Sequence, residues 1–285
     1  MNKRRHPDWL KVPLRGGKNF TEIKKILRHS KLNTICEEAK CPNITECFNN
    51  GTAVFLILGD ICTRNCRYCN VKHGKPHNIN LNEPFDVAES VKKLKLKYVV
   101  ITSVTRDDLS DGGSDFFYKT VKEIRKTNNK CKIEVLIPDF SGNIKSLKKI
   151  VKSKPDVINH NIEVCERLFS NIRPDGNYKL SLSVLKNIKE IQNNVITKSG
   201  FMVGLGENYK EIIKIMEDLY IMGVDFITIG QYLQPTIDHA EIIKYYTPKE
   251  FNEIKKLGEK IGFKHVEAGP LVRSSYHAER AIRWK

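Results

Sequence analysis

The sequence predicts an α/β fold, namely a partial (β/α)6 TIM-type barrel with N- and C-terminal extensions. From residue 54 onward, six short segments rich in Val, Ile and aromatic residues alternate with segments of helical periodicity. Such alternation is typical of a parallel sheet whose strands are connected by helices. Six units are fewer than the eight of a closed barrel. We therefore expect a barrel that is open on one side.

The predicted elements follow in chain order. Before the barrel, residues 15–17 are expected to form a loop and residues 20–27 a short amphipathic helix. The strands are expected at 54–58, 98–104, 132–137, 157–162, 196–203 and 226–232. The helices that follow them are expected at 85–96, 115–126, 144–152, 164–169, 179–192 and 209–222. A last helix over 247–261 precedes a tail with a short strand.

Residues that favour helix ends support several of these boundaries. Asn143 and Asn177 are suited to be N-caps, because an amide oxygen can accept a hydrogen bond from the first helical turn. Thr247 and Glu250 have the spacing of a capping box at the start of the last helix, with a proline between them at the first helical position.

No internal repeat of fixed period and no low-complexity linker divides the chain. We expect one barrel over residues 51–262, preceded by an extension over 1–50 that carries three cysteines. A second extension over 263–285 contains the segment Arg-Ser-Ser-Tyr.

The composition limits the classes of protein to consider. With 285 residues, 40% of them hydrophobic, the chain can bury a sizeable core. No apolar run is long enough to span a membrane, and the basic, polar start lacks the apolar segment of a secretory signal. We therefore expect a reducing, cytoplasmic location and no membrane partner.

The formal net charge of +16 could indicate nucleic-acid binding. However, the lysines are scattered over the predicted helix faces and are not gathered in one arm. We therefore expect no nucleic-acid partner. A basic surface could equally attract an acidic protein.

Three cysteines, Cys62, Cys66 and Cys69, have a C-x₃-C-x₂-C spacing and follow the strand at 54–58 directly. The loop that leaves a barrel strand lies at the catalytic face. A structural zinc site needs four ligands, and the nearest further candidate is His73. A disulfide framework needs pairs and an oxidising compartment. A [4Fe–4S] cluster on three thiolates fits better, because it leaves one iron open.

This motif closely resembles that of the radical S-adenosylmethionine enzymes, and Tyr68 matches their usual aromatic residue before the last cysteine. The resemblance implies the barrel fold and a [4Fe–4S] cluster. It also implies that the open iron binds the amino and carboxylate groups of S-adenosyl-L-methionine.

A second array, Cys36, Cys41 and Cys47, has a C-x₄-C-x₅-C spacing that suits a second cluster but could also serve zinc. Together with the first motif and the Arg-Ser-Ser-Tyr tail, it resembles the lipoyl synthase family over residues 15–278. The resemblance implies an auxiliary [4Fe–4S] cluster on these three cysteines and Ser275. An oxygen ligand is harder than a thiolate, which suits a cluster that is dismantled as a sulfur source.

The activity implied is sulfur insertion at C6 and C8 of a protein-bound octanoyl-lysine to form the lipoyl group. The first cluster would pass an electron to S-adenosylmethionine, and the resulting radical would remove hydrogen from the octanoyl chain. The carbon radical would then attack the auxiliary cluster. The catalytic residues implied are Cys62, Cys66, Cys69 and Ser275.

The resemblance also implies partners. These are octanoylated lipoyl-carrier domains (2-oxoacid dehydrogenase E2 and the glycine cleavage H protein), reduced ferredoxin or flavodoxin as electron donor, and an iron–sulfur carrier protein.

Contacts to S-adenosylmethionine are expected from polar residues near the first motif and at strand ends. Tyr68 and Asn70 are candidates for adenine contacts, because they adjoin Cys69. The carboxyl ends of barrel strands hold ligands. The candidates there are Asn161, Glu163, Arg173, Lys198 and Gln231. Cys131 and Cys165, which belong to neither array, are expected to be buried thiols.

Three other interpretations are weaker. A methylthiotransferase acting on tRNA would suit the charge, but no RNA-binding domain is appended. Biotin synthase has neither the N-terminal array nor the serine tail. A zinc-stabilised nucleic-acid-binding module without catalysis conflicts with the regular strand–helix alternation.

Overall fold

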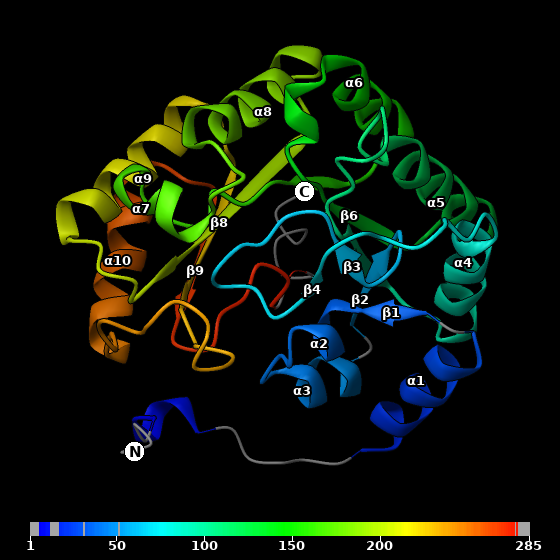
Figure 1. Ribbon diagram of the computed structural model, residues 1–285, viewed down its shortest axis with the longest axis horizontal. Coiled ribbons are helices and arrows are strands. Elements are labelled where there is room, and N and C mark those ends of the chain that lie inside the picture. Colours follow the sequence, from blue (N-terminus) through cyan, green and yellow to red (C-terminus); the bar gives the residue numbers. More distant parts are fainter. Residues whose placement is uncertain (1–5, 12–16, 31, 51, 277, 279–285) are drawn as a thin grey trace.

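The computed structural model in Figure 1 describes residues 6–11, 17–30, 32–50, 52–276 and 278. A curved, mostly parallel sheet is surrounded by helices, and the N-terminal elements lie at the open side (Figure 1). The strands, in spatial order, are β1 (Asn33–Thr34), β2 (Ala53–Ile57), β5 (Tyr98–Ser103), β6 (Lys132–Leu136), β7 (Val157–Asn159), β8 (Ile196–Val203), β9 (Phe226–Gln231) and β10 (His265–Gly269). A separate parallel pair consists of β3 (Ile61–Cys62) and β4 (Lys72–His73).

The six predicted strands are the parallel strands β2 and β5 to β9, which confirms the partial barrel. Two further strands extend the sheet. β10 adds a parallel strand beside β9, and β1 pairs antiparallel with β2. These two strands form the opposite edges of the sheet, so the barrel is open.

Helices cover the outer face of the sheet (Figure 1). Those that follow barrel strands are α4 (Glu83–Lys93), α5 (Ser114–Thr127), α6 (Ile144–Ser153), α7 (Glu166–Ile172), α8 (Tyr178–Ile191), α9 (Tyr209–Ile221) and α10 (Pro248–Ile261). The N-terminal helices are α1 (Lys18–His29), α2 (Ile35–Glu38) and α3 (Ile44–Asn49). Two short 3-10 helices are η1 (Asp8–Leu10) and η2 (Phe140–Gly142). The helix predicted at 20–27 corresponds to α1, while residues 15 and 16 of the predicted loop lie outside the described residues.

The predicted caps are confirmed. The side chain of Asn143 accepts hydrogen bonds from the first turn of α6, and Asn177 does so for α8. Thr247 and Glu250 form the capping box of α10. Polar side chains therefore satisfy amides that the helices leave unpaired.

The fourth strand differs from its prediction. β7 ends at Asn159, three residues before the expected end at residue 162. Beyond it, only Glu163 rejoins the sheet, through a single bridge to Phe201, and its φ of 70° lies in the left-handed region. The regular ladder therefore ends at Asn159, although the N–H of His160 still donates to the carbonyl of Lys198 in β8 at 3.1 Å.

The core supports the carboxyl ends of the strands. All five residues of β2 and all six of β9 are buried, as expected for parallel strands covered on both faces. Cys131 and Cys165 are also buried, as predicted.

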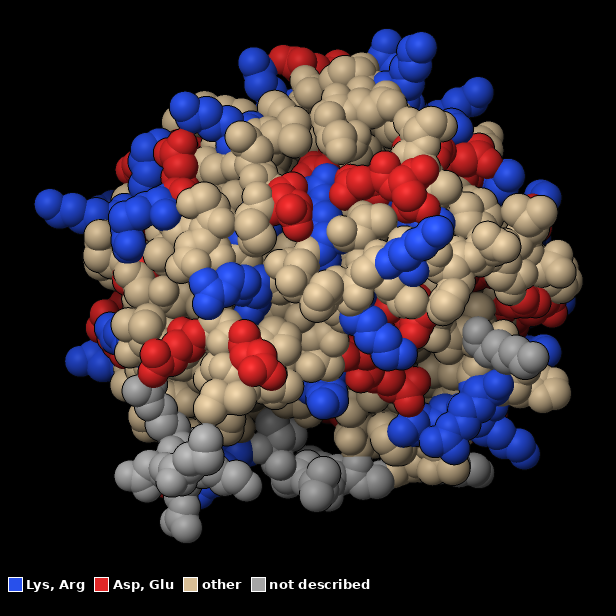
Figure 2. Space-filling view, viewed as in Figure 1, with Lys and Arg blue, Asp and Glu red and all other residues tan. Residues whose placement is uncertain are grey.

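No helix in the described ranges is long and apolar enough to cross a membrane. Figure 2 shows Lys and Arg spread over this face with Asp and Glu between them, as the sequence predicts.

Candidate active site

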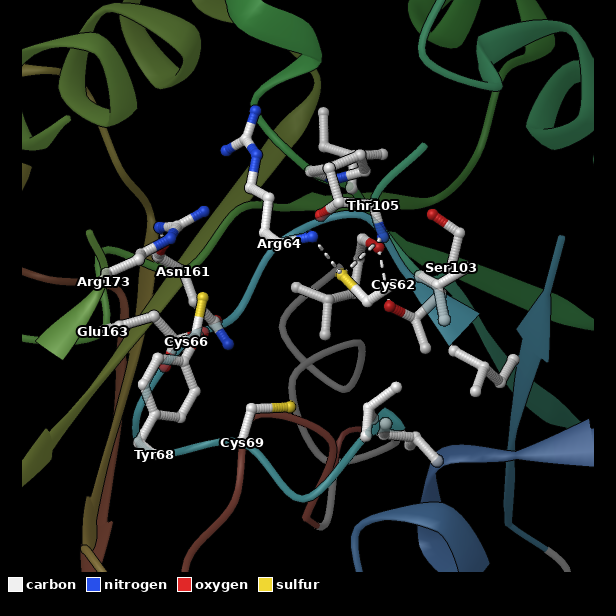
Figure 3. Close-up of a pocket in the computed structure, with 18 of the residues that line it drawn as sticks. Cys62, Arg64, Cys66, Tyr68, Cys69, Ser103, Thr105, Asn161, Glu163 and Arg173 are labelled. Atoms are coloured by element: carbon white, nitrogen blue, oxygen red, sulfur yellow. Dashed lines mark hydrogen bonds between the residues drawn. The ribbon is translucent and has the colours of Figure 1, made fainter. Parts of the chain in front are cut away.

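A cavity at the carboxyl ends of the barrel strands is lined by Cys62, Cys66 and Cys69. Cys62 ends β3, and the other two cysteines lie in the loop between β3 and β4. We call residues 62–69 the cysteine loop. The cavity encloses about 820 Å³ of empty space, including the solvent at its mouth. Figure 3 shows the three sulfur atoms around one open space.

The sulfur of Cys62 is held by backbone amides. Its Sγ accepts a hydrogen bond from the N–H of Thr105 at 3.3 Å and from that of Arg64 at 3.4 Å (Figure 3). Amide donors stabilise a negatively charged sulfur and adjust the properties of an iron–sulfur cluster. The surroundings of Cys62 therefore suit a thiolate ligand.

Arg64 attaches the cysteine loop to the barrel. Its guanidinium donates to both carboxylate oxygens of Asp107, each at 2.8 Å, and also to Asp139. Asp107 follows β5 and Asp139 follows β6, so one side chain connects the loop to two strand ends. On its other side the loop is held by Ile172, whose carbonyl accepts the N–H of Arg67 at 2.9 Å.

Four buried polar atoms of the cavity wall have no hydrogen-bond partner among the described residues. They are Oγ of Ser103, Nε2 of His160, Oδ1 of Asn161 and Nε of Arg173. Buried polar groups are normally hydrogen-bonded, and each unpaired one costs free energy. Their gathering around one cavity indicates a polar ligand.

Ionisable side chains lie beside the cysteines. Burial raises the pKa of Glu163, against the opposing effects of the Arg173 guanidinium and of hydrogen bonds from Asn161 and Tyr68. All four residues line the cavity and lie on the same side of it in Figure 3. The wall thus offers a carboxyl group, a guanidinium and an amide close together.

Three of the predicted cofactor contacts do not line the cavity. Lys198 lies inside the barrel, where its ammonium pairs with Glu134 at 3.1 Å. The side chain of Gln231 is occupied by backbone groups of the loop that follows β9, including the N–H of Tyr246 at 2.9 Å. Asn70 donates to the carbonyl of Glu38, at the end of α2, at 2.7 Å.

The contact of Asn70 matters because α2 carries part of the second cysteine array. Cys36 lies in α2, Cys41 follows it, and Cys47 lies in α3. Ile35, the neighbour of Cys36, also lines the cavity. The two predicted arrays therefore lie on adjacent segments.

The second array is compact and meets the C-terminal tail. Burial raises the pKa of the Cys36 thiol, and the nearby Cys41 and Cys47 raise it further. Burial also raises the pKa of Cys41, against the effect of the Arg273 guanidinium. Arg273 precedes Ser275 by two residues, so the tail that carries the predicted serine ligand lies at this array.

The thiols are suited to a metal–sulfur group. Burial raises the pKa of Cys66 to about 11 and that of Cys69 to about 12. Without a cation such thiols keep their protons, whereas bound iron favours the thiolate. All eight cysteines are free, so none is used in a disulfide. No group of three or more His, Cys, Asp and Glu side chains within the described ranges is arranged to hold a single metal ion.

Two residues of this site were not predicted. His160 follows β7 directly, and a polar residue between Asn159 and Asn161 at a strand end is a signal that could have indicated it. Arg64 lies between two cysteines of the motif, but its partners are 43 and 75 residues away and depend on the fold.

Comparisons with known proteins agree with this geometry. Residues 56–219 match the Radical SAM superfamily, and residues 1–41 match the N-terminal domain of lipoyl synthase of the Radical_SAM family. The lipoyl synthase of Caldicellulosiruptor saccharolyticus is 49% identical over 283 residues, which is 99% of each chain. That of Alkaliphilus metalliredigens is 51% identical over 282 residues, covering 99% of this chain and 97% of the relative.

Solved structures show the same fold at low sequence identity. The FeFe-hydrogenase maturase HydG from Carboxydothermus hydrogenoformans aligns with a TM-score of 0.60 and 14% identity, over 93% of this chain and 77% of that one. Methylornithine synthase aligns with a TM-score of 0.55 and 11% identity, over 87% and 81%. On the evidence of the near full-length relatives, the chain belongs to the lipoyl synthase family of the radical S-adenosylmethionine superfamily.

Proposed function

We propose that this chain is a lipoyl synthase, which inserts two sulfur atoms at C6 and C8 of a protein-bound octanoyl-lysine. The observation that carries the proposal is the cavity that the first cysteine array lines and that reaches the segment carrying the second array. It is bounded by Cys62, Cys66 and Cys69, and it reaches Ile35, which adjoins Cys36. A substrate chain in this cavity would lie between two candidate cluster sites.

The family uses S-adenosylmethionine and [4Fe–4S] clusters, and the donors present fit these groups. We assign one cluster to Cys62, Cys66 and Cys69 and the auxiliary cluster to Cys36, Cys41, Cys47 and Ser275. When bound, these groups supply the radical that removes hydrogen and the sulfur that replaces it. The hydrogen bonds from backbone N–H groups to Sγ of Cys62 and the proximity of Arg273 to Cys41 support the assignment.

The polar side of the cavity would hold S-adenosylmethionine. Arg173 offers a cation for its carboxylate, and Glu163 offers an acceptor for its ammonium or hydroxyl groups. Their neighbours Tyr68 and Asn161, and the unpredicted His160, supply further hydrogen-bonding atoms toward the same space. The unpartnered Nε2 of His160, Oδ1 of Asn161 and Nε of Arg173 support this assignment, because a polar ligand would satisfy them.

The apolar side of the cavity would hold the octanoyl chain. Its wall consists of side chains that cannot hydrogen-bond and that exclude water from a reacting alkyl group. These residues are Ile35, Leu56, Val71, Val104, Leu136 and Ile137.

We assign Lys198 and Gln231 different tasks from those the sequence suggests. Lys198 and Glu134 form an ion pair in the barrel interior, at 3% and 0% side-chain exposure. Gln231 fixes the loop that ends at Tyr246. Asn70 would hold the cysteine loop against α2 and so fix the position of one cysteine array relative to the other.

The partners follow from the same proposal. The substrate would be an octanoylated lipoyl-carrier domain, such as that of 2-oxoacid dehydrogenase E2 or the glycine cleavage H protein. Reduced ferredoxin or flavodoxin would supply electrons, and an iron–sulfur carrier protein would restore the consumed cluster.

We propose a cytoplasmic location. We also propose a division of the chain into an N-terminal extension (1–50), a barrel (51–262) and a C-terminal extension (263–285).

Iron and acid-labile sulfide, measured per chain after anaerobic reconstitution, test the proposal. Two four-iron clusters require about eight irons with matching sulfide. An octanoyl-lysine peptide incubated with S-adenosylmethionine and a reductant should then gain two sulfur atoms by mass spectrometry.

The variant Cys41→Ala should lose about four irons and still cleave S-adenosylmethionine. About four irons in the unaltered chain would contradict the auxiliary cluster, and with it the sulfur insertion. Zinc without sulfide would contradict the enzyme assignment.

A further inference from the structure

The C-terminal residues 271–276, which we call the tail strap, are attached to the N-terminal cysteine array by Asn43. This residue precedes α3 in the N-cap position, yet its side chain makes no capping hydrogen bond. Its amide Nδ2 instead donates to the carbonyl of Leu271 at 2.6 Å, and only 2% of the residue is exposed. A side chain normally used to cap a helix is thus used to hold a segment 228 residues away.

The strap ends in a turn that is attached at one end to β9 and at the other end to the N-terminal cysteine array. The N–H of Tyr276 donates to the carbonyl of Arg273 at 2.9 Å, which places Ser274 and Ser275 inside the turn. Arg273 Nη1 donates to the carbonyls of Val272 at 2.7 Å and Gln231 at 3.3 Å. The contact with Gln231 ties the first end of the turn to the last residue of β9.

The second end of the turn is tied to the cysteine array. The hydroxyl of Tyr276 lies 3.2 Å and 3.3 Å from the two carboxylate oxygens of Glu46, to which it donates. Glu46 immediately precedes Cys47, and Tyr276 immediately follows Ser275. The hydrogen bond therefore joins the neighbours of two residues that we assign to one cluster.

The barrel is shaped to let the strap pass. A Cβ atom on Gly230 would lie 2.1 Å from the carbonyl oxygen of Val272, so a larger residue in β9 would displace the strap. Figure 1 shows the red C-terminal segment beside the end of β9 and close to α2 and α3. All of these contacts are made by protein atoms.

We propose that protein contacts alone hold the tail strap over the N-terminal cysteine array, so that Ser275 is presented whether or not a cluster is bound. Asn43 and the pair of Tyr276 and Glu46 are positioning residues in this arrangement. The part that concerns a cluster depends on the function proposed above. Because that cluster is consumed as the sulfur source, a strap that stays in place keeps the fourth ligand ready for its replacement.

Hydrogen exchange with mass spectrometry on the full chain, cluster-free and reconstituted, tests the strap. Peptides that contain residues 270–276 should be protected in the cluster-free protein, because the N–H groups of Val272 and Tyr276 are hydrogen-bonded. Asn43→Ala should raise their exchange rate about tenfold, as expected for the loss of one buried hydrogen bond. Tyr276→Phe, which cannot donate to Glu46, should raise it less and leave the fold intact.

Asn177→Ala is the matched control, because it removes an asparagine hydrogen bond at α8, away from the strap. It should leave the exchange of 270–276 unchanged. A second readout is the release of iron to a chelator from the reconstituted protein, which should be several-fold faster in Tyr276→Phe than in Ser274→Ala.

Protection of 270–276 that appears only after reconstitution would overturn the proposal, because the cluster would then hold the strap. Equal iron release from Tyr276→Phe and Ser274→Ala would also contradict it. If the protein bound about four irons but kept an Asn43-dependent protected strap, the strap would stand and the sulfur-donor function would fall.

Discussion

Arg64 donates hydrogen bonds to both carboxylate oxygens of Asp139, at 2.6 Å from Nη1 and 2.8 Å from Nη2. The pair is buried, with side-chain exposures of 7% and 1%. Burial raises the pKa of Asp139, but the hydrogen bonds and the charge of the Arg64 guanidinium outweigh this effect and lower the pKa to about 2. The carboxylate is therefore charged. Arg64 is two residues from Cys62 and from Cys66, so this ion pair fixes the loop that would hold the first cluster.

Removing the carboxylate should therefore affect stability and cluster loading together. Asp139→Asn leaves a buried guanidinium with Asp107 as its remaining partner. Breaking a buried pair in this way costs about 3 kcal/mol of unfolding free energy. Urea unfolding should show that loss, and the iron content should fall toward that of the auxiliary cluster alone.

Asp156→Asn is the control for this change. Asp156 pairs with Arg125 at 2.5 Å and with Lys132, the first residue of β6, at 2.9 Å. It therefore acts at the amino ends of the strands, away from the cysteine loop. This variant should lose stability but bind iron normally, and equal iron loading by both aspartate variants would contradict a specific role for Asp139.

Ser275→Cys tests the oxygen ligand assigned to the auxiliary cluster. Thiolate is the usual ligand of iron in such clusters, so the variant should retain the cluster. A tighter fourth ligand should make the cluster harder to dismantle and slow sulfur insertion, while cleavage of S-adenosylmethionine continues. Ser274→Cys, in the same turn, is the matched control. An unchanged rate of lipoyl formation in Ser275→Cys would contradict the labile-ligand explanation.

His160 tests the polar wall of the cavity. Its Nδ1 lies 2.9 Å from the carbonyl of Ile137 and donates to it, so the unpartnered Nε2 is an acceptor in the neutral ring. His160→Gln keeps an acceptor near the Nε2 position, whereas His160→Asn keeps a group that can reach Ile137 and loses the acceptor. We expect S-adenosylmethionine to bind about tenfold more weakly to the Asn variant and nearly normally to the Gln variant.

The pH dependence of S-adenosylmethionine binding follows from the burial of His160. Burial, with a contribution from the Arg173 guanidinium, lowers the pKa of His160 to about 4. The ring therefore stays neutral between pH 6 and 8, and binding should not change because of His160 across this range. A loss of affinity on acidification with a midpoint near pH 6.5, present in the unaltered chain and absent in His160→Gln, would contradict a neutral buried ring.

Much of this architecture is predictable from local signals. Asn143 and Asn177 act as caps through atoms of their own helix, so residue type and position suffice to identify them. The cysteine motif is likewise local, because all three thiols belong to one loop. The two-residue strand β1 is not predictable, since its pairing with β2 rather than its own sequence defines it.

The side chains that converge from several strands were harder to predict. Lys198 points into the barrel, where it pairs with Glu134. It is the third residue of the eight-residue strand β8, so it lies nearer the amino ends of the strands, below the cavity. Alternation along a strand predicts the face of a side chain but not its depth in the barrel. Gln231 does end its strand, yet its amide is taken by the loop before α10, a partner that only the folded chain reveals.

Glu83 holds the turn between β2 and the cysteine loop and should make stability depend on pH. Its carboxylate oxygen Oε2 accepts the N–H of Leu58 at 2.7 Å, where the chain turns out of β2 with a φ of 69°. Burial raises the pKa of Glu83 to about 7, despite the opposing backbone N–H groups of Leu58 and Gly59. In the unfolded chain the ordinary pKa is near 4.5.

Between about pH 4.5 and pH 7 the folded protein therefore binds more protons at Glu83 than the unfolded chain does. The free energy of unfolding should fall as the pH rises through this window, by up to about 3 kcal/mol from this group. Glu83→Gln keeps an acceptor for Leu58 and removes the titration, so urea unfolding from pH 4 to pH 8 should show a smaller decline in this variant. Glu89→Gln, on the same helix, controls for the change in net charge. If Glu83→Gln and Glu89→Gln gave the same dependence on pH, the carboxyl group at the turn out of β2 would be charged throughout, and its hydrogen bond to Leu58 would stabilise the cysteine loop equally at every pH.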